Sequence, residues 1–376
     1  MTEHFDLTII GASFAGLVCA RSAAMRGLKV AVVEAKPDAG ARVHTTGILV
    51  KEAADEIDLP HHLTRRVHGV RLYAPNLKAV DLFAPGYYFL TTDTSGVLCW
   101  LAQEAERAGA RLFFGTRFAD AARQGGMIQL QSPAITTRFL VGADGARSRV
   151  AKTFGLDQNQ KFLTGLEVEY DGLKDADPAF LHCFINSELA PGYIGWAATG
   201  PKVTQVGLAA GPGQTPDLER FLKHTDHLFS YDTGNIVERR SGLIPCGGAL
   251  RNFSDHQVLL IGDAAGLVSP MTGGGIRLAF RSGRRAAQTI SDYLLDLGPE
   301  PGSVLAREQP GFGIKKIMRR GLDLAPPNWL VDFGLTFPGA KSMARRVYFH
   351  RRGNAGIGFQ DFHKQRANRL KPTREI

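Results

Sequence analysis

Three short turns that combine glycine with polar or acidic residues are the parts of this chain whose spacing could do chemistry. They are Gly11–Gly16, Gly142–Gly145 and Gly262–Gly266, and each follows an apolar run typical of a buried strand. Glycine lets a backbone turn tightly and approach a ligand, and Asp144 and Asp263 can accept hydrogen bonds from hydroxyl groups. One such turn alone is a weak signal. Together they indicate one nucleotide site built from distant segments.

The first turn lies inside a strand–helix–strand unit. Asp6–Ile10 and Val30–Val33 predict short buried strands, and Phe14–Met25 between them predicts a helix. The unpaired amides and the dipole at the start of this helix would hold a pyrophosphate. Glu34, about 20 residues further on, would accept hydrogen bonds from ribose hydroxyls. Because this carboxylate would repel a 2′-phosphate, the nucleotide is expected to be FAD or NAD and not NADP.

The residues predicted to contact the nucleotide surround this turn and this acid. Ser13 replaces the middle glycine of the usual fingerprint, and its small side chain still lets the backbone approach a phosphate. Arg42 either neutralises a phosphate or is a solvated arginine. The predicted set is Gly11, Ser13, Phe14, Ala15, Gly16, Glu34, Ala35 and Arg42.

The second and third turns resemble a known superfamily. Val141–Val150 is similar to the Asp-Gly motif of flavoprotein hydroxylases, which share the p-hydroxybenzoate hydroxylase fold. Gly262–Gly266 resembles the second FAD motif of the same proteins. The resemblance implies that FAD is the cofactor and that Asp144 supports its phosphate region. It also implies that Gly262 and Asp263 lie at its ribityl chain.

A glycine run follows the third turn. Pro270–Ile276 resembles the segment that presents backbone amides to the flavin ring, which implies contacts from Gly274, Gly275 and Ile276. A helix that begins there would direct its positive end toward negative charge on the reduced ring. The longer run Gly262–Arg277 is similar to the form characteristic of the geranylgeranyl reductase family.

The resemblance to geranylgeranyl reductases implies an activity. Reduced flavin would pass a hydride from N5 to a C=C bond of a prenyl-type lipid, and a proton would complete the saturation. NAD(P)H or another donor would first reduce the flavin, and the lack of a second complete nucleotide fingerprint fits a nicotinamide that docks transiently. By family position the proton donor is His44, Tyr193 or Cys246. Two segments depart from the family pattern, because Arg42–Ile48 lacks its cysteine and Pro191–Ala197 spaces its aromatic residues differently.

Two other functions fit the same turns. A flavin scaffold of this kind also supports monooxygenases, which hydroxylate small hydrophobic or aromatic substrates with NAD(P)H and oxygen. A flavin-bound lipid carrier without turnover is the third hypothesis. Reoxidation of the flavin by an alkene in the absence of oxygen would distinguish the reductase from both.

The elements that must position these turns predict an α/β fold. Residues 1–155 and 252–295 alternate helix and strand patterns and predict a discontinuous, Rossmann-like FAD-binding domain. Residues 160–250 contain runs that alternate at period two, such as Gly165–Tyr170, and predict an inserted antiparallel β-sheet. The resemblance makes this sheet the substrate domain above the flavin. Residues 296–376 predict a basic, mostly helical C-terminal cap.

Charge in this C-terminal region is lopsided. Its basic residues surround apolar ones that include Trp329 and Phe333, which suits an amphipathic face on an anionic membrane. The alternative is a helical cap over a substrate tunnel, with solvated arginines outside. No recognition motif accompanies the charge, so nucleic acid is not expected as a partner. The basic residues are Lys315, Lys316, Arg319, Arg320, Lys341, Arg345, Arg346, Arg351 and Arg352.

Composition bounds the remaining possibilities. The 376-residue chain has a formal net charge of +9 and four cysteines without metal-like spacing, so no metal site is expected. It contains no apolar run of about 18 residues and no leader before its first strand, so we expect neither a transmembrane helix nor a signal peptide. The expected location is cytoplasmic, either free or peripheral on the inner face of the membrane. The sequence leaves the oligomeric state open.

Overall fold

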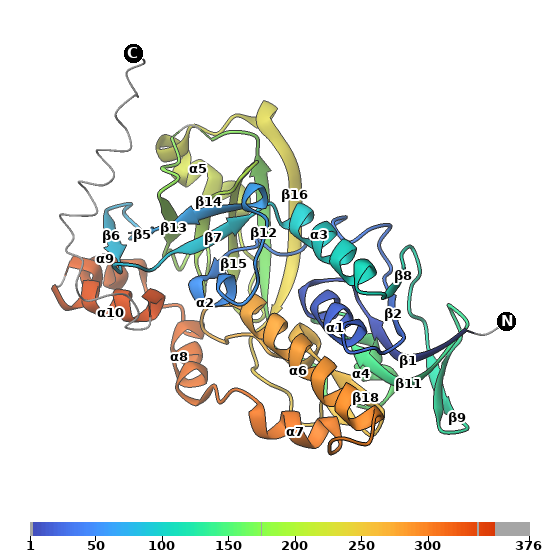
Figure 1. Ribbon diagram of the computed structural model, residues 1–376. Helices are drawn as coiled ribbons and strands as arrows, with labels where there is room; N and C mark the ends of the chain where they lie inside the picture. Colours follow the sequence, from blue (N-terminus) through green and yellow to red (C-terminus); the bar gives the residue numbers. More distant parts are fainter. Residues whose placement is uncertain (1–2, 174, 337, 350–376) are drawn as a thin grey trace, which may run out of the picture.

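The computed structural model describes residues 3–173, 175–336 and 338–349, and these form an α/β architecture with three sheets (Figure 1). The first sheet has eight strands: β1 (Glu3–Ile10), β2 (Val30–Val33), β8 (Arg111–Phe113), β9 (Ala121–Gln124), β10 (Met127–Leu130), β11 (Ile135–Gly142), β17 (Ser254–Asp255) and β18 (Val258–Leu260). Its main order is β17–β18–β11–β1–β2–β8, and β10 and β9 form a hairpin beside β11. Strands β18, β11, β1, β2 and β8 are parallel neighbours, as a nucleotide-binding sheet requires.

Three helices pack together beside this sheet: α1 (Phe14–Ala24), α3 (Thr94–Arg107) and α6 (Ile276–Leu294). The predicted strand–helix–strand unit is confirmed, because β1, α1 and β2 follow one another as expected. The helix that precedes Gly109 is α3. It begins at Thr94 because the side chain of Asp93 accepts a hydrogen bond from the Gly96 amide, 3.0 Å away, and caps the helix.

The second sheet has seven strands: β5 (Gly69–Tyr73), β6 (Ala79–Phe83), β12 (Phe162–Tyr170), β13 (Phe180–Phe184), β14 (Gly195–Thr199), β15 (Thr204–Ala210) and β16 (Ile236–Pro245). They are arranged in the order β16–β12–β15–β14–β13–β5–β6. Helix α5 (Leu218–Phe229) covers one face, where Phe221 and Phe229 pack against Val168 and Tyr170. The other face is therefore the one available to the nucleotide-binding domain.

The predicted boundaries miss two strands of this sheet. β5 and β6 lie within 1–155, which was assigned to the FAD-binding domain, but they extend the second sheet through a parallel pairing of β5 with β13. The sheet is therefore not purely antiparallel. Sequence alternation cannot reveal such a pairing, because it reports which face of a strand is buried and not which strand lies beside it.

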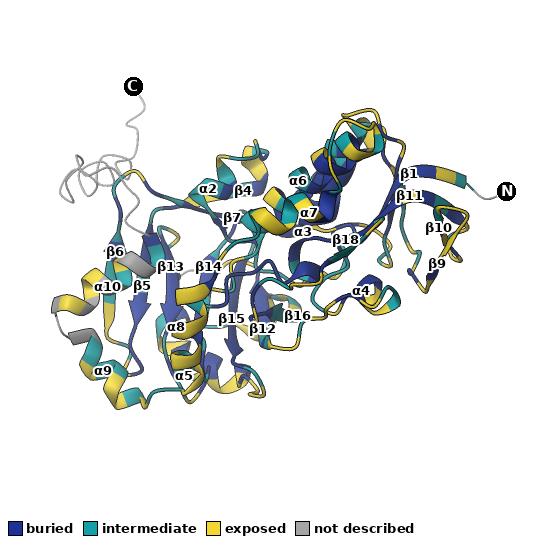
Figure 2. Cartoon of the chain, turned by 90° about the horizontal axis from the view of Figure 1, so that it is seen from below, coloured by how far each residue is buried: buried dark blue, intermediate teal, exposed yellow. Residues whose placement is uncertain are grey.

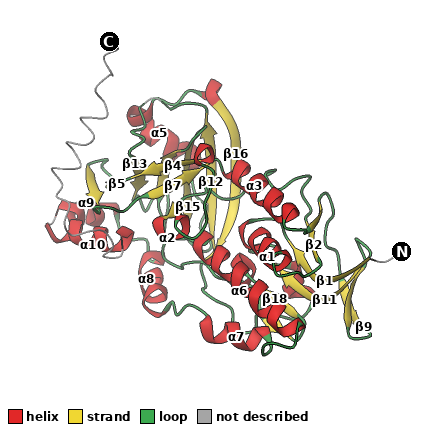
Figure 3. Cartoon of the chain, in the orientation of Figure 1, coloured by secondary structure: helices red, strands yellow, loops and turns green. Residues whose placement is uncertain are grey.

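The remaining elements form a small third sheet, several short helices and a helical C-terminal region. A small sheet consists of β3 (Leu49–Val50), β4 (Thr64–Val67) and β7 (Phe89–Thr92), with the short helix α2 (Lys51–Ala54) beside it. Short helices also occur at η1 (His61–Leu63), α4 (Arg149–Thr153), η2 (Thr233–Asn235) and η3 (Gly262–Ala265). Over its described residues the C-terminal region is helical as predicted, with α7 (Pro301–Glu308), α8 (Gly313–Asp323), α9 (Asn328–Thr336) and α10 (Pro338–Phe349) following the outside of the molecule (Figure 3).

Pro326-Pro327 lies between α8 and α9, and Pro338 begins α10. Arg351 and Arg352, which were predicted to belong to the basic cap, lie outside the described residues. Among the residues described, no helix has both the length and the apolar character needed to cross a membrane.

The contact between α1 and α6 requires glycine at position 283. A Cβ atom there would lie 2.5 Å from the Ala15 carbonyl oxygen and 3.1 Å from the Cys19 amide nitrogen. We therefore expect Gly283→Ala to push the helices apart and lower the free energy of unfolding by about 1–3 kcal/mol, measured as a lower urea midpoint.

The matched control is Gly321→Ala in α8. A Cβ atom at Gly321 would meet nothing within 4 Å, so the same substitution is expected to raise the free energy of unfolding by about 0.5–1 kcal/mol. An unchanged or higher midpoint for Gly283→Ala would contradict the close packing of the two helices.

Candidate functional site

The three glycine turns predicted to form one site meet at one edge of the first sheet. The parallel register aligns Ile10 with Gly142 and Gly142 with Leu260, so β1, β11 and β18 end together. A Cβ atom at Gly11 would lie 2.4 Å from the Ala143 carbonyl oxygen, and one at Gly262 would lie 2.8 Å from the Ala15 Cβ atom. The turns therefore touch one another directly, as a site built from distant segments requires.

The start of α1 is open to an anion. Gly11 has a φ of 107°, and a Cβ atom at Gly16 would lie 1.9 Å from the Gly11 carbonyl oxygen, so both positions require glycine. Ser13 occupies the N-cap position and makes no side-chain capping bond, which leaves the first amides of the helix available. The side chain of Phe14 is buried and stacks edge-on against Phe280, so only its backbone faces the turn.

Glu34 lies beside this turn at the end of β2. Its carboxylate accepts hydrogen bonds from the amides of Ala12, at 2.7 Å, and Lys36, at 2.9 Å. The acid is thus held at the edge of the pyrophosphate cradle, where ribose hydroxyls are expected. Ala35 and Arg42 are exposed, and Arg42 has a positive φ of 45°.

Asp144 is engaged within its own loop. One carboxylate oxygen accepts from the Ser148 hydroxyl at 2.7 Å, and the other accepts from the amides of Arg149 and Val150 at 2.6 and 3.1 Å. Burial still raises the pKa of this carboxyl above its usual value, against the effect of these bonds. The visible role of Asp144 is therefore to hold the start of α4 against the first turn.

Asp263 differs from Asp144 because no hydrogen bond offsets the desolvation of its carboxylate. Among the described residues its carboxylate accepts no hydrogen bond, and burial raises its pKa to about 6. One of its oxygens would lie 3.3 Å from a Cβ atom at Gly275. A half-buried acceptor without a protein donor fits a ligand that supplies hydroxyl groups, such as a ribityl chain.

The glycine run leads directly into α6, a helix of 19 residues. Gly275 is its N-cap residue and provides no side-chain cap, so the first amides of α6 remain open at Ile276. A Cβ atom at Gly274 would meet only the Thr272 hydroxyl, at 3.4 Å. The run therefore places a positive helix end and an uncrowded backbone next to Asp263.

Two of the three predicted proton donors meet opposite this glycine run. The Tyr193 hydroxyl donates a hydrogen bond of 2.6 Å to the Thr272 carbonyl oxygen, and burial raises the pKa of the phenol far above its usual value. Burial also raises the pKa of the Cys246 thiol. Both belong to one apolar cluster on the second sheet: Leu163, Tyr193, Trp196, Ala209, Ile244 and Cys246.

The third predicted donor, His44, lies outside this cluster. It is exposed, and its Nδ1 atom lies 2.9 Å from the Ser241 carbonyl oxygen on β16. The segment that carries it, residues 42–48, follows β2 of the first sheet and reaches the second sheet. There the Thr46 hydroxyl donates a hydrogen bond to the side chain of Glu167 on β12.

Glu167 is a site residue that sequence reasoning missed. The alternation in Gly165–Tyr170 predicted one buried and one polar face, but the polar face is covered too, and Glu167 and Glu169 are each 5% exposed. The signal was two acids at period two in an otherwise apolar strand. Period alone cannot tell a polar face in water from one packed against another domain.

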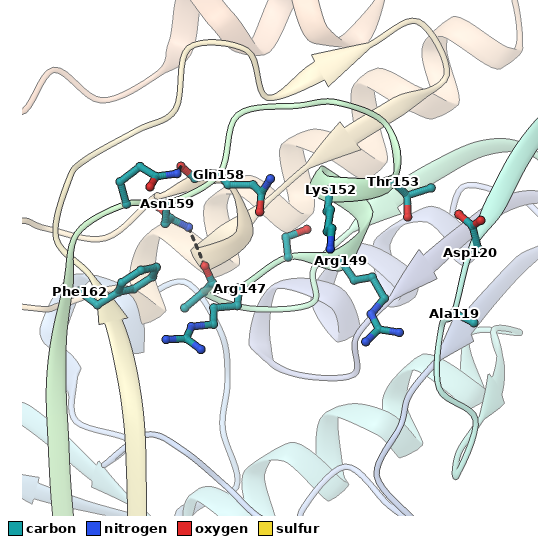
Figure 4. Close-up of a pocket in the computed structure, with 12 residues that line it drawn as sticks. Ala119, Asp120, Arg147, Arg149, Lys152, Thr153, Gln158, Asn159 and Phe162 are labelled. Atoms are coloured by element: carbon teal, nitrogen blue, oxygen red, sulfur yellow. Dashed lines mark hydrogen bonds between the residues drawn. The ribbon is translucent and has the colours of Figure 1, made fainter.

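A basic cleft beside the Asp144 loop was also missed (Figure 4). It has a volume of about 790 Å³ and contains the cationic side chains of Arg147, Arg149 and Lys152. Asn159 forms part of its wall and donates hydrogen bonds to the carbonyl oxygens of Ala146, at 3.1 Å, and Asp263, at 2.8 Å. The cleft thus lies next to the predicted flavin site. Within the described parts of the chain, His, Cys, Asp and Glu form no cluster that could hold a metal ion.

Comparison with known proteins identifies the same cofactor. A family model described as "FAD binding domain" matches residues 4–294. A digeranylgeranylglycerophospholipid reductase of Methanothrix thermoacetophila is 29% identical over 352 residues, which cover 85% of this chain and 86% of that protein. A reductase of the same name from Methanosphaera stadtmanae is 27% identical, covering 77% of this chain and 78% of that protein.

Solved structures share the fold. A geranylgeranyl bacteriochlorophyll reductase-like protein from Thermoplasma acidophilum superposes with a TM-score of 0.78, covering 98% of this chain and 97% of its own at 20% identity. Aklavinone-11 hydroxylase superposes with a TM-score of 0.62 at 18% identity, covering 78% of this chain and 64% of its own. The predicted α/β FAD-binding architecture is therefore confirmed. This chain belongs to the FAD-binding domain family.

Proposed function

We propose that this protein is an FAD-dependent oxidoreductase that reduces C=C bonds of a prenyl-type lipid. The observation that carries the proposal is the apolar cluster around Trp196, which faces the glycine run before α6. A hydrocarbon substrate needs such a wall, because burial of its apolar surface is the main source of its affinity. The names of these two relatives, both digeranylgeranylglycerophospholipid reductases, support this substrate class.

The chain's own residues would hold FAD along the edge of the first sheet. The open amides at Phe14–Gly16 would bind its pyrophosphate, Glu34 its ribose and Asp263 its ribityl chain. The N-terminus of α6, at Gly274–Ile276, would stabilise negative charge on the ring. When bound, FAD would supply a hydride at N5. The apolar cluster would exclude water and orient the alkene against the ring.

The basic cleft supports the proposal that NAD(P)H docks transiently as electron donor. Its cations, Arg147, Arg149 and Lys152, suit the phosphates of a dinucleotide. Asn159 links this cleft to the backbone of Asp263. A donor bound there would adjoin the flavin site without occupying the first glycine turn, which FAD requires.

The second candidate function is a monooxygenase, and the specific observation that favours it is the fold shared with aklavinone-11 hydroxylase. Fold alone does not determine chemistry on such a scaffold. The two activities differ in their need for oxygen, so one kinetic experiment separates them.

The C-terminal helices support a peripheral contact with an anionic membrane. Much of α8 and α9 is exposed (Figure 2). The exposed residues on these helices and between them include the large apolar Leu324, at 84%, and Trp329, at 67%, and basic residues such as Arg320 accompany them. One predicted member of this basic face is misplaced. Arg319 is buried and bonds to Asp323 and to the Gly192 carbonyl oxygen, so it anchors α8 to the second sheet.

Flavin binding is tested by Asp263→Ala. Without the carboxylate the ribityl hydroxyls lose their acceptor, so we expect the purified variant to retain little or no FAD, measured by flavin absorbance per protein. Asp263→Asn keeps one acceptor oxygen and is expected to retain part of the flavin. A fully loaded Asp263→Ala protein with normal circular dichroism would show that the ribityl chain lies elsewhere.

Reductase activity is tested by anaerobic stopped-flow of the photoreduced protein with prenyl lipids of increasing length. We expect flavin absorbance to return without oxygen and one C=C bond to be lost per flavin oxidised, measured by mass spectrometry. NAD(P)H oxidation that needs both substrate and oxygen would instead establish the monooxygenase. Reoxidation no faster than without lipid would rule out this substrate class.

Membrane contact is tested by flotation with vesicles of phosphatidylglycerol and phosphatidylcholine. Replacing Leu324 and Trp329 together by serine is expected to reduce the bound fraction several-fold, because interfacial binding scales with buried apolar area. Leu297→Ser is the matched control, since Leu297 is 75% exposed but lies outside α8 and α9. Equal flotation of both variants would contradict an interface on α8 and α9.

A further inference from the structure

Reduction of a C=C bond consumes a proton as well as a hydride, and the predicted donors are poorly placed to supply it. The hydroxyl proton of Tyr193 is committed to the Thr272 carbonyl oxygen. Cys246 is a weak acid in an apolar cluster, and its pKa is raised further by burial. His44 is exposed and faces the Ser241 carbonyl oxygen on β16. The source of the proton must therefore be sought among other groups on the inner face of the second sheet.

Glu167 lies on that face. The side chains of Leu163 and Glu167, four residues apart, lie on the same face of β12, and Leu163 belongs to the apolar cluster. Trp196, packed against the same cluster, donates a hydrogen bond of 2.9 Å from its indole nitrogen to Glu167 Oε2. Glu167 is therefore joined directly to the wall that faces the glycine run before α6.

The second donor to Glu167 comes from the FAD-binding domain side. The Thr46 hydroxyl donates to the same oxygen, Oε2, at 2.6 Å. Both donors thus occupy one oxygen, and Oε1 has no hydrogen-bond partner among the described residues. In a neutral carboxyl the proton would reside on Oε1, because Oε2 serves as the acceptor. The structure therefore holds a buried acid with its proton-bearing oxygen left for another molecule.

The surroundings of Glu167 favour the protonated form. Burial raises its pKa above the usual value, and the two hydrogen bonds oppose this shift. The facing charges are Arg240, its neighbour on β16, and Glu169, two residues along its own strand. Arg240 is already paired with Glu169 at 2.8 Å, and both are less than a tenth exposed, so the positive charge is largely committed. His44 is the titratable neighbour on the segment that carries Thr46.

We propose that Glu167 is the proton donor of this site, an inference that rests on the proposed reductase function. Reduced FAD, when bound, would supply a hydride and its two electrons to one carbon of the C=C bond, and Glu167 Oε1 would supply the proton to the other carbon. Glu167 would then be a carboxylate held by Thr46 and Trp196. Between turnovers the carboxylate regains a proton from solvent, which reaches the segment 42–48 at its exposed residues.

The test compares variants by anaerobic reoxidation of the photoreduced flavin with the prenyl lipid that reoxidises the wild type fastest, across a range of pH. If Glu167 must be protonated, the wild-type rate is high at low pH and falls as pH rises through the pKa of Glu167. Glu167→Gln keeps the volume and an acceptor oxygen for Thr46 and Trp196 but carries no acidic proton. We expect its rate to drop by about 10²- to 10⁴-fold and to lose that pH dependence.

Thr46 supplies a matched pair of variants that leaves the acid in place. Thr46→Val removes a donor that stabilises the carboxylate, so the pKa of Glu167 rises and the falling part of the profile moves to higher pH. Thr46→Ser keeps the hydroxyl and is expected to keep the wild-type profile. A structural role for Glu167 would lower the rate at every pH without moving the profile.

The outcomes separate this inference from the function on which it rests. If no prenyl lipid reoxidises the wild-type flavin, the proposed function fails. If the wild type is active and Glu167→Gln, with normal flavin content, matches its rate and pH profile, the function stands and Glu167 is not the donor. A profile that does not move in Thr46→Val would also overturn the assignment.

Discussion

The contact between backbones at the carboxyl edge of the first sheet is the constraint on which the site depends. Gly11 lies against the Ala143 carbonyl, Gly16 against the Gly11 carbonyl and Gly262 against Ala15, each at a distance that leaves no room for a side chain. These contacts bring three segments from the beginning, middle and last third of the chain within reach of one ligand. They also leave the helix starts at α1 and α6 without side-chain caps, so that both can receive negative charge.

Three carboxylates near this edge differ in their hydrogen-bond partners and therefore in their roles. Asp144 satisfies both oxygens inside its own loop and holds α4 in place. Glu34 is oriented by two backbone amides but remains at the rim of the cradle. The half-buried carboxylate of Asp263 accepts no hydrogen bond from the described residues, and its partial desolvation is unfavourable unless a ligand supplies a donor. In the proposed placement of FAD, hydroxyl groups of the ribityl chain would supply the donors that Asp263 lacks in the protein.

The second sheet contributes the apolar wall and couples it to the cofactor domain. Tyr193 bonds to the glycine run, Thr46 reaches across to Glu167, and Arg319 on α8 holds the loop at Gly192. Each of these bonds joins segments more than 75 residues apart, so the wall is held in position by all parts of the chain. Because it bonds to the Gly192 carbonyl oxygen, Arg319 is buried. The apolar residues of α8 and α9 that support a membrane contact are exposed instead.

The sequence by itself determined the cofactor, the three turns and most elements, because these depend on local order. Glycines at fixed spacing, Glu34 at the end of β2 and the proline breaks before α9 and α10 act through backbone geometry that neighbouring residues impose. Tertiary structure alone decided which strands pair and which polar groups are buried. The pairing of β5 with β13 and the burial of Glu167 join residues far apart in the chain. Alternation along β12 shows that one face is polar, but only the packing of the FAD-binding domain removes that face from water and makes its acid available for chemistry.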